Sequence, residues 1–311
     1  MTHKIYIVMK GWCGFGDRLQ VLSCCLSYCK LFDATLCVDW RDSMWGQGVL
    51  DFSNYFEVID IPVITIEEIS IKMERGTQVI PHIWTPKLMR ETPDSTQSSK
   101  YNCNYNCQSN WKYNKQDLII VLNSYGRRQY NCINLVQNIR LIPTAQEAIK
   151  KRLHKLTLPA SIIHIRGTDR IPSKNSIYEV FDKLETDFKM LPQTRCFIVT
   201  DMEILMIEWL KKHSECELLN DSSSTRRLSF YKKCSKVGIH NISTYDLKLY
   251  NVSKHELNLD CISDLVAICF ASNAIGNNNS YFYSMARNIH NLHISVGSWF
   301  NSWTPRINEC Y

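Results

Sequence analysis

The sequence predicts an α/β protein built from two Rossmann-like domains. Its 311 residues are more than a single core usually organises, and they suit two domains of about 150 residues each. Short apolar runs of strand length alternate with longer runs of helical periodicity, which favours parallel sheets covered by helices. Hydrophobic residues make up 45% of the chain and charged residues 21%, which is an ordinary globular composition.

A strand–turn–helix–strand unit opens the chain. Its predicted elements are a buried strand at 4–9, a glycine-rich turn at 11–16, an apolar helix at 17–32 and a second strand at 35–39. This order is typical of the start of an open parallel sheet. Residues 90–117 are polar and aperiodic, which predicts a long surface loop, and residues 118–122 return to the sheet as a strand.

The second half alternates more regularly. Pro143, together with the spacing of Thr144 and Glu147, predicts a helix that starts with a capping box. We therefore place the domain boundary there, which gives an N-terminal domain of residues 1–140 and a C-terminal domain of residues 141–311. The predicted strands are 161–165, 195–200, 216–219, 273–277 and 292–296, and the predicted helices are 176–190, 202–213, 255–272 and 280–290. In a domain of this kind, ligands bind beyond the carboxyl ends of the strands.

Charge and hydropathy narrow the classes of function. The net charge of +6 is a mild basic excess, which suits an anionic small ligand and falls short of a nucleic-acid-binding surface. No apolar run approaches the length of a membrane span. Cys24, Cys25 and Cys29 fall in one apolar helical pattern, as free buried thiols do in a reducing compartment. We expect a cytoplasmic protein, or a lumenal Golgi-type protein if the chain has been trimmed of an anchor.

The segment from His164 to Arg170 carries the first chemical signal. An apolar strand ends there in charged residues, which places His164 and Arg166 where doubly wound domains bind phosphates. A guanidinium can hold a diphosphate through two parallel hydrogen bonds and can stabilise the charge on a departing diphosphate. A local ion pair between Arg166 and Asp169 is the alternative interpretation.

Asp264 and Ser280 form the second signal. Asp264 lies on a largely apolar predicted helix, where a carboxylate needs hydrogen-bond donors such as N1–H and N2–H of guanine. Ser280 follows Asn279 and opens the next helix, whose free N–H groups and partial positive charge can receive phosphate. An exposed position for Asp264 and a simple helix cap at Ser280 are the alternatives.

Four blocks of the sequence, in order, carry a resemblance to one enzyme family. They are Gly14-Phe-Gly16-Asp17-Arg-Leu-Gln with Leu36 to Ser43, then His164-x-Arg166-x-x-Asp169, then Val199-Thr-Asp201, and finally Asp264 placed sixteen residues before Ser280. Over roughly residues 10–290, this pattern resembles the nodulation and α1,6-fucosyltransferases and their α1,2- and protein O-fucosyltransferase relatives. The resemblance implies a GT-B-like fold with two Rossmann-like domains facing a cleft, in which the C-terminal domain binds GDP-fucose and the N-terminal domain receives the acceptor.

The same resemblance implies an inverting transfer of fucose to a glycan hydroxyl, with no metal and no cofactor. Arg166 would bind the β-phosphate, His164 and Asp264 the guanine, and Ser280 the phosphates. Further residues expected at the donor are Gly14, Gly16, Arg170, Asp201 and Asn279. The chain contains no Asp-x-Asp motif, the usual manganese clamp of other glycosyltransferases, and Cys103-x3-Cys107 lacks a second Cys/His pair for a zinc site.

The general base is where the sequence departs from the family. An inverting transfer needs a carboxylate to remove the proton of the acceptor hydroxyl. The family's loop glutamate falls on Lys174 here, so we take Glu179 as the first candidate, with Asp17 and Asp169 as the others. This departure leaves open a non-catalytic GDP-sugar binder. The donor sugar is also open, because no residue in the motifs distinguishes fucose from mannose.

Two more alternatives concern the N-terminal half. An NAD-dependent enzyme would explain why Gly14-x-Gly16 follows a strand and Asp39 ends the next one, but the third glycine of that fingerprint is replaced by Leu19. Aromatic rings can stack on acceptor sugars or simply fill the core. The tryptophans in question are Trp12, Trp40, Trp45, Trp84 and Trp111.

Overall fold

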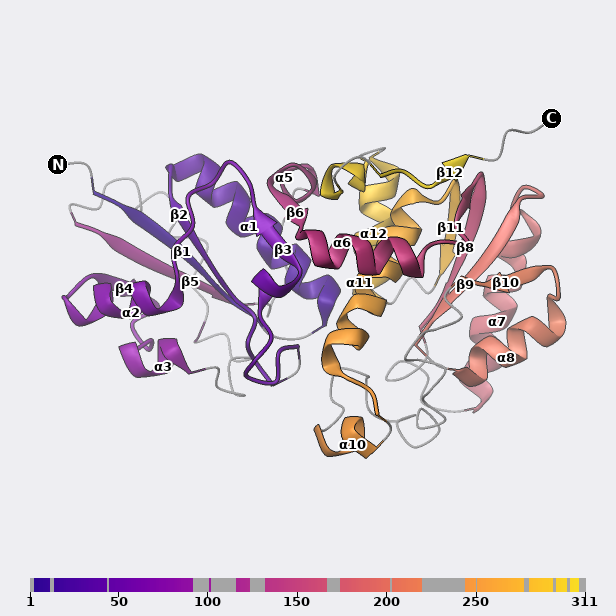
Figure 1. Ribbon diagram of the computed structural model, residues 1–311, viewed down its shortest axis with the longest axis horizontal. Helices are drawn as coiled ribbons and strands as arrows, with labels where there is room; N and C mark the ends of the chain where they lie inside the picture. The colour runs from indigo at the N-terminus through magenta and orange to yellow at the C-terminus, as the bar shows by residue number, and fades with distance from the viewer. Residues whose placement is uncertain are drawn as a thin grey trace. The chain divides into compact units, whose positions relative to one another are not determined.

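The computed structural model divides the chain into two compact units, residues 1–142 and residues 143–311. It describes residues 3–11, 14–43, 45–91, 101, 116–123, 132–166, 174–201, 203–219, 244–249, 251–276, 280–292, 295–300 and 303–307. Each unit has a four-stranded parallel sheet with helices on both faces (Figure 1). The predicted α/β fold of two Rossmann-like domains is therefore confirmed.

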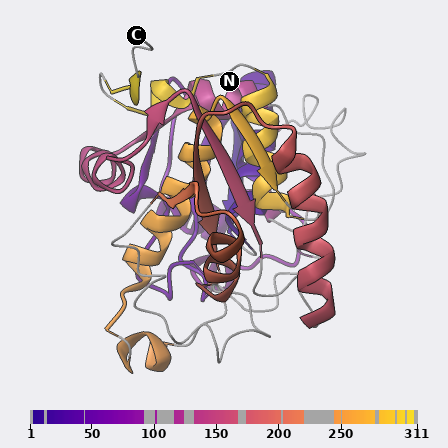
Figure 2. The same cartoon turned by 90° about the vertical axis from the view of Figure 1, so that its right-hand side faces the viewer.

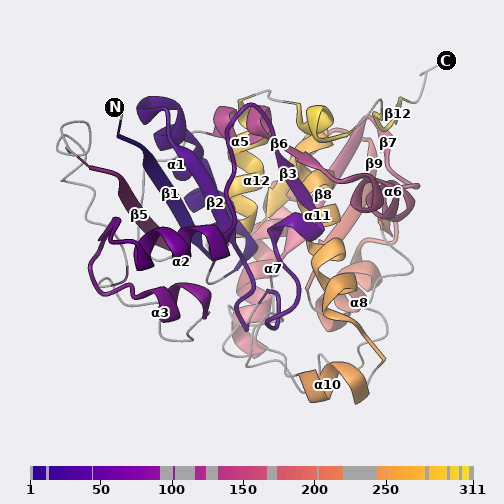
Figure 3. The same ribbon diagram turned by 60° about the vertical axis from the view of Figure 1, so that its left-hand side comes forward.

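The sheet of the first unit has the strand order β2-β1-β5-β4. Its strands are β1 (Ile5–Lys10), β2 (Thr35–Asp39), β4 (Gln78–Ile80) and β5 (Leu118–Asn123). Helices α2 (Ile66–Glu74) and α3 (Pro86–Arg90) cover one face, where Tyr6 and Val8 join their core (Figure 3). Helices α1 (Phe15–Phe32) and α5 (Cys132–Asn138) pack together on the other face. This two-sided burial explains why β1 and β5 read as continuous apolar runs.

The glycine-rich turn is shorter than the sequence suggests. Helix α1 begins at Phe15, so Gly16 lies buried in its first turn, and Gly14 is the N-cap with an extended backbone. Asp33 ends the helix in the left-handed conformation, at φ 50°. Cys24, Cys25 and Cys29 form no disulfide and are buried in α1, as predicted.

The sheet of the second unit has the order β10-β9-β8-β11. Its strands are β8 (Ala160–Ile165), β9 (Arg195–Thr200), β10 (Cys216–Leu218) and β11 (Asn273–Gly276). Helices α7 (Lys174–Lys189) and α8 (Glu203–Lys212) cover one face, and α11 (Lys254–Phe270) and α12 (Tyr281–Asn291) the other (Figure 2). Because side chains alternate along a strand, Ile163 and Ile165 pack toward α7 while His164 points toward α12.

Shorter elements complete the two units. In the first they are the 3₁₀ helix η1 (Phe52–Asn54) and the antiparallel pair β3 (Phe56–Val58) and β6 (Ile139–Leu141). In the second they are α6 (Pro143–Arg152), β7 (Thr157–Leu158), α10 (Thr244–Leu249), the 3₁₀ helix η6 (Val296–Trp299) and β12 (Arg306–Ile307).

Two local predictions are wrong. The described residues of the strand predicted at 292–296 are not in a strand, because Leu292 is the C-cap of α12 and the Ser295 hydroxyl accepts from Gly297 N at 3.0 Å, which starts η6. The capping box at Thr144 is also absent. Helix α6 already includes Pro143 and Thr144, and Glu147 pairs instead with Lys150 at 2.8 Å.

Other sequence predictions concern regions that the structure describes only in part. Most of the surface loop predicted at 90–117, including the Cys103-x3-Cys107 motif, lies outside the described residues. Within the described part of the chain, no helix combines the length and the apolar character needed to cross a bilayer.

Candidate functional site

Five of the predicted site residues lie at the carboxyl end of the second sheet or on the helices packed beside it. His164 is the last but one residue of β8, Arg166 follows β8, Asp201 follows β9, Asp264 lies on α11, and Ser280 caps α12. We refer to these five residues as the carboxyl-end cluster. This is the position at which an open parallel sheet binds its ligands.

Arg166 is held in one orientation by Asp201. Its Nη1 atom lies 2.9 Å from Asp201 Oδ2, and the two side chains are 18% and 12% exposed. The Thr200 hydroxyl donates to Ile165 O at 2.7 Å, which ties the ends of β9 and β8 together. The acid that pairs with Arg166 in the described structure is thus Asp201, whereas Asp169 lies outside the described residues. A guanidinium fixed in this way is ordered before any anion arrives.

His164 is buried between two rings of α12. The imidazole is stacked on Tyr283, with ring centroids 5.5 Å apart and planes 8° apart, and it lies 5.4 Å from the Phe282 ring. Its Nδ1 atom has no hydrogen-bond partner within the described part of the chain. Burial lowers the pKa of His164 to about 4, helped by Arg166 and opposed by Asp201. His164 is therefore neutral at physiological pH and can accept a hydrogen bond.

Asp264 is a member of the carboxyl-end cluster whose pKa is shifted by its surroundings. Burial raises the pKa of its carboxyl well above the usual range, Asp260 and Asp201 raise it further, and Arg152 opposes them. Arg152 is itself engaged by Asp260, with Nε 2.7 Å from Oδ1. The raised pKa favours the protonated carboxyl in the free protein, and hydrogen-bond donors from a ligand would favour the ionised form.

Ser280 is the N-cap of α12. It is 4% exposed, and its hydroxyl accepts from Tyr283 N at 3.3 Å. The strand before it ends at Gly276, which is in register with His164 on β8. The start of α12 and the end of β8 are therefore adjacent, which brings Ser280 into the same neighbourhood as His164.

Comparison with known proteins rests on structure. By sequence, no protein-family model and no curated protein matches the chain. By structure, it aligns with NodZ α1,6-fucosyltransferase soaked with GDP-fucose at a TM-score of 0.60 and 15% identity, over 93% of both chains. The fucosyltransferase NodZ from Bradyrhizobium aligns at 0.59 and 16%, over 92% of this chain and 93% of that one. NodZ co-crystallised with GDP aligns at 0.58 and 15%, over 92% of both.

The chain has the GT-B-like fold of the fucosyltransferase NodZ. This confirms the fold that the four sequence blocks implied, over nearly the whole length of both chains. Within the NodZ-like fold, the carboxyl-end cluster belongs to the second unit.

Other predicted site residues are placed differently or not at all. Asp169, Arg170 and Asn279 lie outside the described residues. Glu179 is exposed in the second turn of α7, and no contact with the carboxyl-end cluster is found for it. Gly14 lies in the first unit, at the start of α1.

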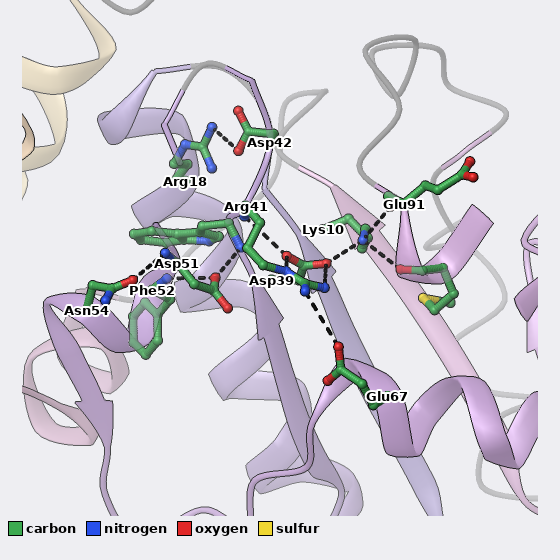
Figure 4. Close-up of polar contacts among 12 residues, drawn as sticks. Lys10, Arg18, Asp39, Arg41, Asp42, Asp51, Phe52, Asn54, Glu67 and Glu91 are labelled. Atoms are coloured by element: carbon green, nitrogen blue, oxygen red, sulfur yellow. Dashed lines mark hydrogen bonds and ion pairs between the residues drawn. The ribbon is translucent and has the colours of Figure 1, made fainter. Parts of the chain in front are cut away.

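A second polar cluster lies at the carboxyl end of the first sheet (Figure 4). Lys10 Nζ donates to Asp39 Oδ2 at 2.5 Å, to Met89 O at 2.8 Å and to Glu91 O at 3.0 Å. Asp39 also accepts from Arg41 Nε at 3.0 Å, and Arg41 Nη1 lies 3.5 Å from Glu67. We call Lys10, Asp39, Arg41 and Glu67 the charge chain. It runs from the buried Lys10 to the exposed Glu67.

The tryptophans of the first unit fill its core. Trp40, Trp45 and Trp84 are at most 5% exposed, so none of the three offers a face to an acceptor sugar. Trp40 and Trp45 instead flank the buried Arg18, which pairs with Asp42 at 2.7 Å. The interpretation of these rings as core residues is the one that the structure bears out, while Trp12 and Trp111 lie outside the described residues.

Sequence reasoning missed the residues that support His164. Tyr283 and Phe282 read as ordinary apolar positions of an amphipathic helix. The available signal was spacing, since Tyr283 follows Ser280 by three residues, the position that an N-cap side chain contacts. Its contact with His164 could not be read from the sequence, because 119 positions separate the two residues.

Proposed function

We propose that the protein is an inverting, metal-independent glycosyltransferase that moves fucose from GDP-fucose to a hydroxyl of a glycan acceptor. The observation that carries this proposal is the carboxyl-end cluster in a chain with the fold of NodZ. An arginine paired with Asp201, a neutral histidine whose Nδ1 has no partner among the described residues, and an aspartate whose pKa is raised by burial lie together there. GDP carries groups that suit all three side chains, because its guanine and ribose offer hydrogen-bond donors and its diphosphate is an anion. The cytoplasmic location expected from the sequence is part of this proposal.

The arrangement assigns a task to each side chain. Asp264 accepts from N1–H and N2–H of guanine, His164 accepts from a further donor of the nucleoside, and Arg166 and the start of α12 face the diphosphate. In the transfer, the acceptor oxygen bonds to the anomeric carbon from the side opposite GDP, and the bond to the β-phosphate oxygen breaks. Arg166 stabilises the charge that develops on that oxygen.

The acceptor proton needs a base. Of the sequence candidates, Glu179 is exposed on α7, Asp17 lies in the first turn of α1, and Asp169 is outside the described residues. Glu179 stays our proposal for this role, and the alternative of a GDP-sugar binder without transfer stays with it. Transfer to any glycan in a panel decides between the two.

An NAD-dependent reaction has less support. Asp39, the residue that would bind the ribose of NAD, already accepts from both Lys10 and Arg41. Its carboxylate has little capacity left for a ribose hydroxyl. Leu19, at the third glycine position, is fully buried in α1.

The first experiment is a calorimetric titration with GDP, GDP-fucose, GDP-mannose and NAD, in the presence of a metal chelator. We expect micromolar binding of the three GDP ligands and none of NAD. Preference between the two sugars names the donor. Binding of NAD without GDP would refute the proposed function.

Asp264 makes donor binding dependent on pH. Its carboxyl has a raised pKa in the free protein, yet guanine needs the ionised form, so binding releases a proton. GDP affinity should therefore rise as the pH rises through the raised pKa of Asp264. Asp264→Asn should weaken GDP binding about ten- to hundredfold, the effect of losing charge-assisted hydrogen bonds.

The controls for this prediction separate Asp264 from the phosphate of GDP, which titrates near pH 6. Calorimetry in two buffers of different ionisation enthalpy counts the protons released. The part of the pH dependence that belongs to Asp264 disappears in Asp264→Asn and persists in Asp182→Asn, a change at an exposed position on α7. Equal proton release from wild type and Asp264→Asn would contradict the assignment.

A further inference from the structure

Tyr283 lies where three elements of the second unit meet. Its ring is stacked on His164 of β8, its hydroxyl donates to Ala274 O of β11 at 2.9 Å, and its N–H is capped by Ser280 at the start of α12. The side chain is 1% exposed. Burial raises the pKa of Tyr283 to about 12, so the hydroxyl stays protonated and remains a donor. One residue thus connects two members of the carboxyl-end cluster.

Gly276 provides the space for this contact. A Cβ atom at that position would lie 2.9 Å from two ring atoms of Tyr283 and 2.9 Å from His164 O. Real Cβ atoms do not approach other atoms so closely, and the His164 carbonyl is backbone within a sheet. The absence of a side chain at Gly276 therefore lets the Tyr283 ring lie against β8 and β11.

The imidazole depends on this packing for its orientation. Within the described part of the chain, the Nδ1 atom of His164 is buried and has no hydrogen-bond partner. A hydrogen bond at one ring nitrogen commonly orients a histidine, but at His164 the rings of Tyr283 and Phe282 flank the imidazole instead of a partner at Nδ1 among the described residues. The Tyr283 ring, which lies nearly parallel to the imidazole, restricts the imidazole to the plane of the stack.

We propose that Tyr283 is a positioning residue for the donor site, which orients the His164 ring and the capped start of α12 so that one nucleotide meets both. Gly276 contributes to the same arrangement, because its lack of a side chain leaves space for the Tyr283 ring. The inference rests on the proposed function for its ligand, GDP. The geometry of the Tyr283–His164 stack can be tested without that ligand.

The test uses substitutions of the ring itself. Tyr283→Leu removes the stack and leaves the backbone N–H that Ser280 caps, whereas Tyr283→Phe keeps the stack and removes only the bond to Ala274. We expect Tyr283→Leu to weaken GDP binding about ten- to hundredfold, as misplaced binding groups do, and Tyr283→Phe to stay within about threefold of wild type. Gly276→Ala, which displaces the ring, should resemble Tyr283→Leu.

Two readouts separate positioning from general destabilisation. NMR of the His164 imidazole, assigned by its loss in His164→Gln, should show changed ring-current shifts and a pKa raised toward 6.5 in Tyr283→Leu and wild-type values in Tyr283→Phe. Phe181→Leu is the matched control. It removes a ring that is 2% exposed on the opposite face of the same sheet, and it should leave both the imidazole and GDP binding as they are.

The proposal is overturned if Tyr283→Leu leaves the His164 signals unchanged, or if Phe181→Leu weakens GDP binding as much as Tyr283→Leu does. A wild-type protein that binds no GDP refutes the proposed function instead. In that case the imidazole signals still decide whether Tyr283 orients His164.

Discussion

Replacing Arg166 with alanine should lower the rate of fucosyl transfer about 10²- to 10³-fold, which is the effect of removing one preorganised group from a developing oxyanion. The guanidinium is ordered by Asp201 at 2.9 Å and lies at the carboxyl end of β8. Its removal also leaves the charge of Asp201, 12% exposed, without this cation in the proposed diphosphate site. The lost stabilisation of the oxyanion and the remaining charge of Asp201 both slow the departure of GDP from the sugar.

The measurement is the formation of GDP from GDP-fucose with the best acceptor of a glycan panel, together with calorimetry of GDP. Arg166→Lys keeps the charge but not the planar fork, so it should recover only part of the rate. Arg195→Ala is the matched control, because Arg195 starts β9 at the opposite end of the sheet and pairs with the exposed Glu217. Equal transfer rates for Arg166→Ala and Arg195→Ala would contradict a role of Arg166 in the transfer step.

Replacing Asp39 with alanine should lower the free energy of unfolding by about 3–5 kcal/mol, the cost of leaving one partner of a buried ion pair uncompensated. Lys10 and Asp39 are 2% and 1% exposed, and Lys10 would keep the carbonyls of Met89 and Glu91 but no carboxylate among its hydrogen-bond partners in the described part of the chain. Arg41 would lose its bonds to Asp39 at the same time and keep its contact with Glu67. Chemical denaturation of wild type and variant measures the difference.

Two variants test the reason for this loss. Glu67→Ala removes the exposed end of the charge chain, where Arg41 and Glu67 are 3.5 Å apart, and should cost about 1 kcal/mol or less. The double change Lys10→Met with Asp39→Leu removes both buried charges and should be markedly more stable than Asp39→Ala alone. A double variant as unstable as Asp39→Ala would show that lost charge compensation is not the cause.

The charge chain also makes the stability of the first unit depend on pH in the acid range. Burial alone would raise the pKa of Asp39, but Lys10 and Arg41 more than offset it, so the pKa is lowered. A lowered folded-state pKa means that this stabilisation is fully present above the pKa of an unfolded aspartate, about 3.9, and is lost as the pH falls through the folded-state value. Acid unfolding of wild type should therefore be steeper than that of the double variant.

The sequence by itself determined the strand–helix–strand unit that opens the chain, the four strands of the second sheet with the helices that follow them, and the residues at the carboxyl ends of those strands. His164, Arg166 and Asp201 could be placed because burial on both faces makes a parallel strand read as an apolar run, and the first charged residues after it mark its carboxyl end. Ser280 could be placed because a helix start needs a side-chain acceptor. These signals involve residues close together in the chain, so they can be recognised in a single sequence.

Only the tertiary structure decided which of these residues meet. Asp201 pairs with Arg166 across 35 positions of sequence, because β9 lies beside β8 in the sheet. Tyr283 orients His164 because the register of β11 and β8 brings Gly276, without a side chain, to the one place where a ring must fit. Contacts of this kind depend on strand pairing and packing between distant segments, and apolar periodicity says which residues are buried but not which of them touch.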